Sequence, residues 1–339
     1  MLNFSLVGCG HIARKHALAL EQVEDARLTA VCDNAYERAV SLGVQYGATP
    51  YADYSKFLTE AGIDAVVICT PSGLHAPMVQ KAAQSGKHIL VEKPFVLNVK
   101  EGKKLVELCQ ANGVKLGVVH PNRAKPIVQA LLKAVSQGWF GTITHASAVL
   151  RWNRNPEYFR GSSWRGTKEM DGGILFNQAI HNIDLFNWLV GPVEEVFAYS
   201  ATRMHKIQCE DVCICALKLA NGALGLLEAA VTLYPENLEE SIAIFGTQGT
   251  AILGGKSLSK ILEWKFSCLE AEEAQVQAEL LNSQQKGNGH QEVINDFVKA
   301  VLLNSVPMVS GEEALKVLQL IQAIYQSTET HLPVKVNLD

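Results

Sequence analysis

A glycine-rich motif close to the start of the sequence has the residue types and spacing that bind a dinucleotide. The motif G-x-G-x-x-A begins at Gly8, directly after a strand-like run and directly before a helical pattern. Gly8 permits a tight turn, Gly10 lets the backbone approach a pyrophosphate, and Ala13 is small enough for a helix to pack closely on a strand. The first turn of that helix, at His11 and Ile12, offers N–H groups to the phosphates. The motif therefore predicts a phosphate-binding turn.

The choice of dinucleotide depends on Asp33, which follows the next strand-like run. A carboxylate at this distance from the glycines accepts hydrogen bonds from both hydroxyls of an adenosine ribose. The same carboxylate repels a 2′-phosphate, and the following residue, Asn34, carries no positive charge to offset it. The sequence therefore predicts NAD rather than NADP as the cofactor.

Two further motifs follow later strand-like runs, T-P-S-G-L-H from Thr70 and E-K-P from Glu92. In an open α/β sheet, ligands bind beyond the carboxyl ends of the strands. A lysine placed there can donate a hydrogen bond to a reacting oxygen and assist proton transfer, although E-K-P alone also fits a surface lysine at a sheet edge. We expect both motifs to contribute to the cofactor site, through Thr70, Pro71, Ser72, His75, Glu92 and Lys93.

The elements that position these motifs alternate regularly over residues 1–121. Short apolar runs separated by helical patterns are typical of a parallel sheet with helices on both faces. The runs that we expect to be strands are Leu2–Val7, Leu28–Cys32, Ala65–Cys69, His88–Val91 and Val114–Val119. The sequence therefore predicts an α/β fold class, with a doubly wound NAD-binding domain over 1–121.

The rest of the chain, 122–339, has a different pattern. A long helix is expected near Gly173–Trp188, followed by consecutive strand-like segments joined by turn residues such as Asn221-Gly222. This order predicts a C-terminal α+β domain that binds substrate, with a large open, mainly antiparallel sheet and a helix on one face. Because the other face of such a sheet needs a cover, we expect a homodimer or homotetramer.

Composition excludes several classes of protein. With 339 residues, 48% hydrophobic and 19% charged, the chain is typical of a folded two-domain protein. A net charge of −4 gives no electrostatic reason to expect nucleic acid or an anionic membrane as partner, and no apolar run is long enough to span a bilayer. Among the eight cysteines only Cys209, Cys213 and Cys215 cluster, without a histidine at zinc-finger spacing. We expect a cytoplasmic protein with reduced thiols and no metal.

Taken together, G-x-G-x-x-A, T-P-x-x-x-H and E-K-P in this order resemble the Gfo/Idh/MocA family of NAD(P)-dependent sugar oxidoreductases. The resemblance extends over essentially the whole chain, including Asp171-Gly172-Gly173 and the segment Asn177–Asp184. It implies a Rossmann domain followed by an α/β domain with an open sheet. It also implies catalytic roles for Lys93 and His181.

One departure from the family pattern concerns the residue four positions before His181. Many members have aspartate there, whereas this chain has Asn177. Residues at i and i+4 share a helix face, so Asn177 can orient a substrate hydroxyl, but it cannot act as a base. His181 is therefore expected to remove the hydroxyl proton with assistance from Lys93.

The segment between Arg151 and Lys168 combines five basic residues with four aromatic ones. Such a run is often a solvated loop. Just before the helix that carries His181, however, guanidinium groups and rings suit a phosphorylated or carboxylated substrate with a flat base. The residues expected to hold the sugar, its carboxylate or the diphosphate are Asn122, Arg123, Arg165, Asn177 and Gln178.

Local sequences at Trp164–Thr167, Asp171–Asp184 and Tyr234–Glu240 look closest to one subgroup of the family, the UDP-N-acetyl-2-amino-2-deoxyglucuronate 3-dehydrogenases. That resemblance implies oxidation of the 3-hydroxyl of UDP-N-acetylglucosaminuronate to a 3-keto sugar nucleotide, for bacterial surface polysaccharides such as the O-antigen of lipopolysaccharide. Some members reoxidise bound NADH with 2-oxoglutarate. The alternatives are a dehydrogenase of another sugar or inositol, a non-catalytic NAD(H)-binding protein, and an NAD-dependent hydrolase, for which no suitable pair of carboxylates is evident.

Overall fold

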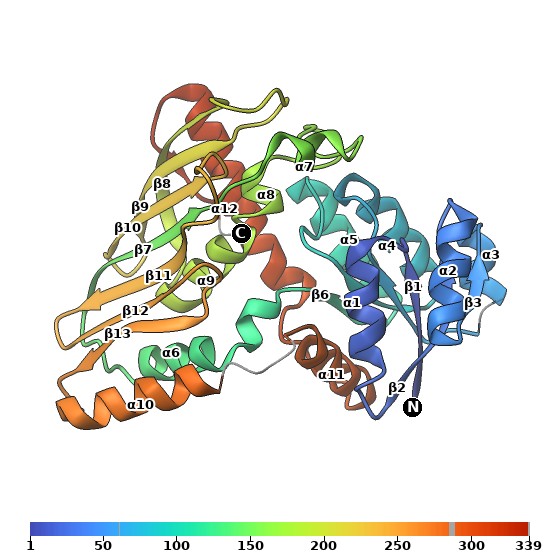
Figure 1. Cartoon of the computed structure of the whole chain (residues 1–339), viewed down its shortest axis with the longest axis horizontal. Helices are drawn as coiled ribbons and strands as arrows, with labels where there is room; N and C mark the ends of the chain where they lie inside the picture. Colours follow the sequence, from blue (N-terminus) through green and yellow to red (C-terminus); the bar gives the residue numbers. More distant parts are fainter. Residues whose placement is uncertain (61, 285–288, 338–339) are drawn as a thin grey trace. The chain divides into compact units, whose positions relative to one another are not determined.

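The chain forms two compact units in a computed structural model that describes residues 1–60, 62–284 and 289–337 (Figure 1). The first unit contains Met1–Pro121 and a later segment that ends at Leu315. The second begins at Asn122 and resumes at Lys316. The expectation of an uninterrupted second domain, 122–339, therefore does not match the packing, because helix α11 (Gly289–Leu302) belongs with the first unit.

The first unit is built on a six-stranded parallel sheet in the order β3-β2-β1-β4-β5-β6. The strands are β1 (Leu2–Val7), β2 (Ala26–Cys32), β3 (Thr49–Tyr51), β4 (Ala65–Ile68), β5 (His88–Val91) and β6 (Leu116–Val118). The connecting helices are α1 (His11–Leu20), α2 (Tyr36–Tyr46), α3 (Tyr54–Glu60), the 3₁₀ turn η1 (Ser72–Leu74), α4 (His75–Gln84) and α5 (Val99–Ala111). This confirms the predicted doubly wound sheet, whose order of strands reverses between β1 and β4, where such sheets bind ligands.

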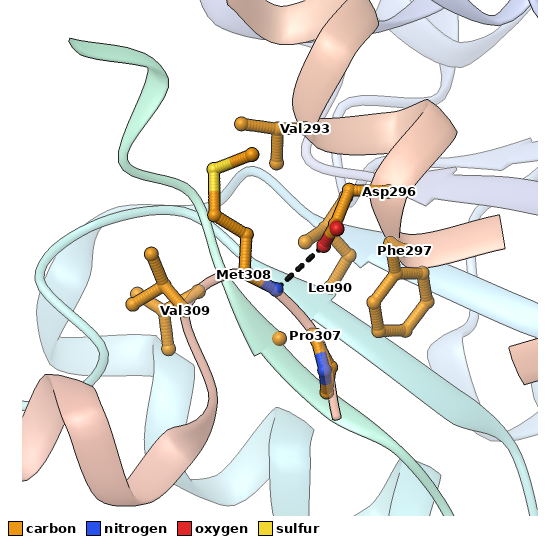
Figure 2. A pocket seen from close by; sticks show the side chains of 9 residues that line it. Leu90, Val293, Asp296, Phe297, Pro307, Met308 and Val309 are labelled. Carbon is orange, nitrogen blue, oxygen red and sulfur yellow. Dashed lines mark hydrogen bonds between the residues drawn. The ribbon is translucent and has the colours of Figure 1, made fainter. Parts of the chain in front are cut away.

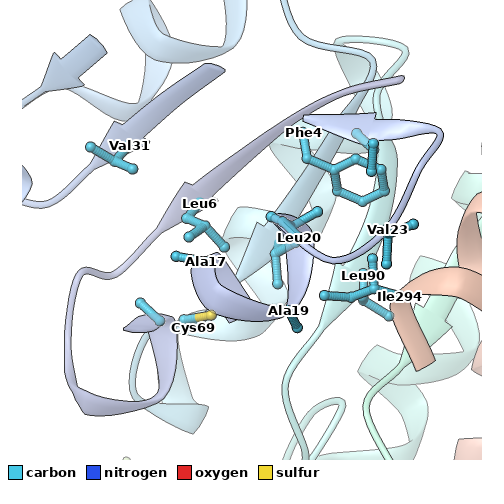
Figure 3. Close-up of a cluster of buried hydrophobic side chains, with 14 of the residues drawn as sticks. Phe4, Leu6, Ala17, Ala19, Leu20, Val23, Val31, Cys69, Leu90 and Ile294 are labelled. Atoms are coloured by element: carbon cyan, nitrogen blue, oxygen red, sulfur yellow. The ribbon is translucent and has the colours of Figure 1, made fainter. Parts of the chain in front are cut away.

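The core of the first unit explains why α11 joins it. Phe4 of β1 and Phe297 of α11 meet edge to face with ring centroids 6.3 Å apart. Figure 3 shows the apolar cluster around β1 and α1, to which Ile294 of α11 also belongs. Ala13 and Ala17 of α1 are completely buried in it. The amphipathic face of α11 thus covers apolar surface that the first 121 residues leave open.

A small pocket of about 10 Å³ lies under α11, at the lower limit of what holds one water molecule. Figure 2 shows its lining, which includes Val293, Phe297 and Met308. Asp296 accepts a hydrogen bond from the Met308 backbone N–H, and this contact fixes the chain that follows α11. With so little space and mainly apolar walls, the pocket is an imperfection in core packing.

The second unit contains an eight-stranded mixed sheet in the order β13-β12-β11-β7-β10-β9-β8-β14. Only β7 and β10 pair in parallel, so the prediction of a mainly antiparallel sheet is confirmed. The strands are β7 (Ile143–Arg151), β8 (Val193–Ala201), β9 (Val212–Leu219), β10 (Leu224–Ala230), β11 (Glu239–Gly246), β12 (Gly249–Gly254), β13 (Lys260–Phe266) and β14 (Val334–Lys335). The helices are α6 (Pro126–Ser136), α7 (Pro156–Arg160), α8 (Ile174–Asn177), α9 (Ile180–Val190) and α10 (Ala271–Ser283). The 3₁₀ turn η2 (Pro121–Ala124) belongs to this unit from Asn122, and α12 (Gly311–Thr330) from Lys316.

The two faces of this sheet differ in their cover. Helix α9 packs on β7 and β11, and Cys213 and Cys215 are buried with their sulfur atoms 3.7 Å apart. Alternate positions on the central strands instead expose large apolar side chains, among them Tyr199 and Leu224, each 61% exposed. None of the helices in the described part of the chain is both long and apolar enough to cross a membrane.

Candidate active site

The glycine turn after β1 has one glycine that the fold requires and one that it does not. Gly8 has φ of +87°, and a Cβ there would lie 2.8 Å from the carbonyl of Cys69 and the backbone nitrogen of Thr70. Gly10, the N-cap of α1, has extended backbone angles, and a Cβ there would meet nothing within 4 Å. Internal packing therefore gives no reason for Gly10. Open space at the start of a helix fits the close approach of a pyrophosphate.

Asp33 is fixed beside this turn by the backbone. Its Oδ2 accepts a hydrogen bond from the Cys9 N–H at 2.8 Å, and its Oδ1 accepts one from the Ala35 N–H at 2.9 Å. A carboxylate oxygen can accept two hydrogen bonds, so each oxygen keeps capacity for a ribose hydroxyl. The turn and Asp33 together fit an adenine dinucleotide without a 2′-phosphate.

A pair of alanine substitutions separates the two glycines. Gly8→Ala should destabilise the protein by about 2–4 kcal/mol, because the new Cβ meets backbone atoms and the backbone angle is unfavourable for alanine. Gly10→Ala should leave the free energy of unfolding nearly unchanged but weaken NADH binding at least about tenfold, through contact with the pyrophosphate. Urea unfolding and NADH fluorescence titration measure the two effects. Normal NADH affinity in Gly10→Ala would contradict this placement of the phosphates.

His75 connects the two motifs that follow β4 and β5. Its Nδ1 lies 2.7 Å from the Pro94 carbonyl oxygen, and its Nε2 lies 2.9 Å from that of Thr70. Burial lowers the pKa of His75, and a neutral ring can donate only one of these two bonds. We assign the proton to Nδ1, which makes the shorter contact. His75 is almost completely buried. Through its two ring nitrogens it holds the loop that contains Thr70 against the loop that contains Lys93 and Pro94.

Glu92 holds the backbone of Lys93 and is itself held by α1. Its Oε1 lies 2.7 Å from Nε2 of His16, and its Oε2 accepts the Lys93 N–H at 3.2 Å. Burial alone would raise the pKa of Glu92, but the His16 hydrogen bond and the nearby His290 and Lys93 charges lower it to about 2. Within the described residues, His16, Glu92 and His290 also form the one cluster with metal-ligand atoms, all within 4.8 Å of one another. Nε2 of His16 already bonds to Glu92, and Glu92 in turn accepts the Lys93 N–H. These contacts explain the cluster as a support for the Lys93 backbone.

The helix expected near Gly173–Trp188 is interrupted in the structure. Helix α8 ends at Asn177 and α9 begins at Ile180. The Ala179 N–H bonds to the Ile174 carbonyl, a spacing of five residues that is wider than an α-helical turn. Between 173 and 186 all residues are buried except Asn177 and His181. Asn177 and His181 are therefore the two partly exposed positions of this segment, one on each side of the break.

Two of the predicted substrate residues around this break have defined protein contacts. The Asn177 Nδ2 donates to Oδ1 of Asp171, and the Gln178 Nε2 donates to the Tyr158 hydroxyl at 2.9 Å. Gln178 is only 4% exposed. Its contact assigns it to holding Tyr158, whereas Asn177 is only partly buried.

Tyr158 is the centre of an arginine–aromatic cluster, which consists of Trp152, Arg154, Tyr158, Trp164 and Arg165. The guanidinium carbons of Arg154 and Arg165 lie 5.1 and 4.2 Å from the Tyr158 ring centroid. Buried N–H donors at Trp152 Nε1, Arg154 Nε and Arg165 Nε have no hydrogen-bond partner among the described residues. Two neighbouring guanidinium groups and three N–H donors without a partner suit an anionic ligand, which would supply negative charge and acceptor oxygens.

Of two further predicted substrate residues, Arg123 has a structural task, whereas Asn122 makes a single long hydrogen bond to the protein. Arg123 is 2% exposed, forms a two-point ion pair with Asp184 at 2.9 and 2.6 Å, and stacks on Trp188. The expectation that Arg123 contacts substrate is therefore replaced by a structural role, because its guanidinium lies inside the second unit. Asn122 is half-buried, and its Nδ2 donates to Glu240 at 3.4 Å.

Glu210 is a buried acid that the sequence analysis missed. Its Oε1 accepts hydrogen bonds from the Tyr325 hydroxyl at 2.8 Å and from the Leu175 N–H in α8 at 3.2 Å. Burial raises the pKa of Glu210 to about 7, although these hydrogen bonds partly oppose the shift. The only signal in the sequence is a pair of acids, Glu210-Asp211, directly before an apolar strand. Glu210 thus fixes the start of the segment that carries Asn177 and His181.

The raised pKa of Glu210 predicts a pH-dependent stability. In the unfolded chain its carboxyl ionises near 4.5 and in the folded chain near 7, so the folded state is disfavoured progressively as pH rises between these values. Above both pKa values, the resulting loss in the free energy of unfolding is about 3 kcal/mol. Glu210→Gln removes the ionisation and should gain about 2–3 kcal/mol over the wild type between pH 5 and pH 8. Urea unfolding at both pH values measures this gain, and Glu157→Gln at an exposed position should show none.

Comparisons with known proteins agree with this geometry. Residues 2–120 match the model "Oxidoreductase family, NAD-binding Rossmann fold" of GFO_IDH_MocA, and residues 128–252 match the GFO/IDH/MocA C-terminal domain. The structure is similar to the WlbA dehydrogenase from Bordetella pertussis, solved in complex with NADH and UDP-GlcNAcA. The identity is 37%, the TM-score is 0.96, and the match covers 100% of this chain and 98% of the other.

Curated relatives include dehydrogenases of other substrates. D-apiose dehydrogenase of Paraburkholderia graminis is 27% identical, with 95% of this chain and 86% of the relative covered. Myo-inositol 2-dehydrogenase of Thermotoga maritima is 26% identical, with 99% and 98% covered. All three similar proteins are thus dehydrogenases, whereas the compounds that they act on or bind differ.

Proposed function

The chain belongs to the Gfo/Idh/MocA family and is an NAD-dependent sugar dehydrogenase, and from this premise we propose that it oxidises the 3-hydroxyl of UDP-N-acetylglucosaminuronate. The product is the 3-keto sugar nucleotide, and the proposed setting is the biosynthesis of a bacterial surface polysaccharide. The similarity to the WlbA dehydrogenase complex supports this choice over a neutral sugar.

The observation that carries the proposal is the arginine–aromatic cluster around Tyr158. Three of its buried N–H donors have no hydrogen-bond partner among the described residues. Its two guanidinium groups each donate to a backbone carbonyl through Nη1, at Asn153 and Tyr158, and keep further N–H groups for an acceptor. Burial lowers the pKa of Arg154, and the neighbouring charge of Arg165 acts in the same direction. A diphosphate or a carboxylate relieves both the repulsion and the missing hydrogen bonds, while inositol and apiose carry no charge to do so.

In the proposed mechanism His181 removes the proton from the sugar 3-hydroxyl, and Lys93 donates a hydrogen bond to the same oxygen. Asn177 orients a neighbouring hydroxyl, and Arg165 binds an anionic group of the substrate. Gly8, Gly10 and Asp33 would hold the pyrophosphate and ribose of the cofactor. When bound, NAD supplies the hydride acceptor for the carbon that becomes a ketone.

A substrate panel tests the proposal against its alternatives. UDP-N-acetylglucosaminuronate, UDP-N-acetylglucosamine, myo-inositol and D-apiose are compared by kcat/KM for NAD reduction, in the wild type and in Arg165→Gln. The proposal expects the UDP-uronate to be preferred by at least about 100-fold, with that preference reduced in the variant. Equal or better oxidation of inositol or apiose would contradict it, and reduction with none of the sugars would favour a non-catalytic NAD(H)-binding protein. Adding 2-oxoglutarate to the UDP-uronate reaction shows whether it reoxidises the cofactor.

The exposed face of the mixed sheet supports the proposal of a homodimer or homotetramer. Tyr199 and Ile214 are cross-strand neighbours on this face, and Leu224 and Leu226 extend it on β10. Several large apolar side chains exposed on one face of a sheet are typical of an interface. Sedimentation equilibrium of the wild type and of Ile214→Glu tests whether this face joins the subunits.

A further inference from the structure

Asp171 lies at the point where the two parts of the proposed substrate site meet. It is 2% exposed. Its Oδ2 accepts the Gly166 N–H at 2.7 Å, directly after Arg165, and its Oδ1 accepts the amide N–H of Asn177. One buried carboxylate thus bonds both to the loop that carries Arg165 and to the side chain of Asn177.

These contacts determine which end of the Asn177 amide faces Asp171. The NH₂ group of Asn177 donates to the Asp171 carboxylate, so the Asn177 Oδ1 points away from it. Asn177 and His181 are the two residues of the segment 173–186 that are not buried. The amide therefore presents an acceptor oxygen, rather than a donor, on the side away from Asp171.

We propose that Asp171 is a positioning residue, which holds the carbonyl oxygen of Asn177 toward a substrate hydroxyl and fixes the backbone beside Arg165. The inference rests on the proposed function, since it assigns Asn177 to the substrate. It also explains why asparagine suits position 177. Aspartate there would bring two carboxylates into contact, and one of them would have to take up a proton.

Exchanging the two side chains tests this role. Asp171→Asn removes the group that fixes the amide, so Asn177 turns or loses its partner, and Asn177→Asp creates the repulsive pair. Each single variant should lower kcat by about 10- to 100-fold, with the affinity for NADH unchanged. The double variant D171N/N177D restores an amide–carboxylate bond, keeps an acceptor for the Gly166 N–H, and again presents an oxygen to the substrate. Its kcat should return to within about threefold of the wild type.

The double variant separates positioning from mere stabilisation. If Asp171 only stabilised the loop, all three variants would change in melting temperature and the double variant would recover no more activity than the better single one, which would overturn the inference. The assay uses whichever sugar of the panel the wild type oxidises, so failure of the UDP-uronate proposal is seen in the wild type alone.

A readout without turnover completes the test. In ¹H–¹⁵N spectra the Asn177 side-chain NH₂, identified by its loss in Asn177→Asp, should exchange slowly with solvent in the wild type. It should exchange faster in Asp171→Asn. Equal exchange rates would overturn the inference even if no sugar of the panel were oxidised.

Discussion

Replacing His181 with asparagine should lower kcat by about 10²- to 10⁴-fold, the range that a general base contributes. Asparagine retains polarity and approximate size but accepts no proton near neutral pH. His181 is one of the two residues between 173 and 186 that are not buried, so the substitution does not open the core. Steady-state kinetics with the oxidised sugar measures the loss.

Binding measurements decide how a loss of activity in His181→Asn is interpreted. NADH affinity and melting temperature should stay near those of the wild type, because His181 belongs to the second unit and the glycine turn to the first. His145→Asn, at an exposed position on β7, is the matched control and should retain full activity. A wild-type rate in His181→Asn would show that another group removes the proton.

Replacing Lys93 with methionine should lower kcat by about 10²- to 10³-fold, the usual cost of removing one donor to a developing oxyanion. The Lys93 backbone is fixed by Glu92, which is fixed in turn by His16. The backbone from which the Lys93 side chain extends is therefore fixed before substrate binds. Methionine fills the same space without the charge.

Lys93→Arg distinguishes charge from geometry. Arginine keeps the positive charge but presents a planar group of different reach, so activity should remain well below that of the wild type. Lys81→Met, on the exposed side of α4, should have no effect on kcat. If Lys93→Met kept more than about half of the activity, the role assigned to this lysine in proton transfer would be wrong.

Sequence patterns predicted the elements whose apolar spacing is regular and missed those whose spacing is not. The five apolar runs of the first unit correspond to β1, β2, β4, β5 and β6, because buried parallel strands have nearly continuous apolar sequences. Strand β3 has three residues including Pro50, and β13 mixes three charged residues with apolar ones next to a polar segment. Edge strands that are so short, or that carry so many charges, have too little apolar pattern to be distinguished from loops.

The sequence predicts those residues of the candidate site whose proposed chemistry depends on a short motif alone. Gly8, Asp33 and Lys93 follow strands in motifs whose chemistry is local. The partners of Arg123 and Glu210 are 61 and 115 positions away, at Asp184 and Tyr325. No local pattern distinguishes a guanidinium that binds substrate from one that pairs inside the fold. For the same reason, the role of Asp171 became visible only from its two hydrogen bonds.

The most direct test of the proposed function is one incubation of the purified protein with NAD and UDP-N-acetylglucosaminuronate deuterated at C3. Mass spectrometry of both reaction products follows the label. Oxidation at C3 predicts a sugar nucleotide that has lost the deuterium together with the hydroxyl proton, and a reduced nicotinamide that carries the deuterium. An unchanged sugar nucleotide, or a product oxidised with the deuterium still on C3, would contradict the proposed reaction.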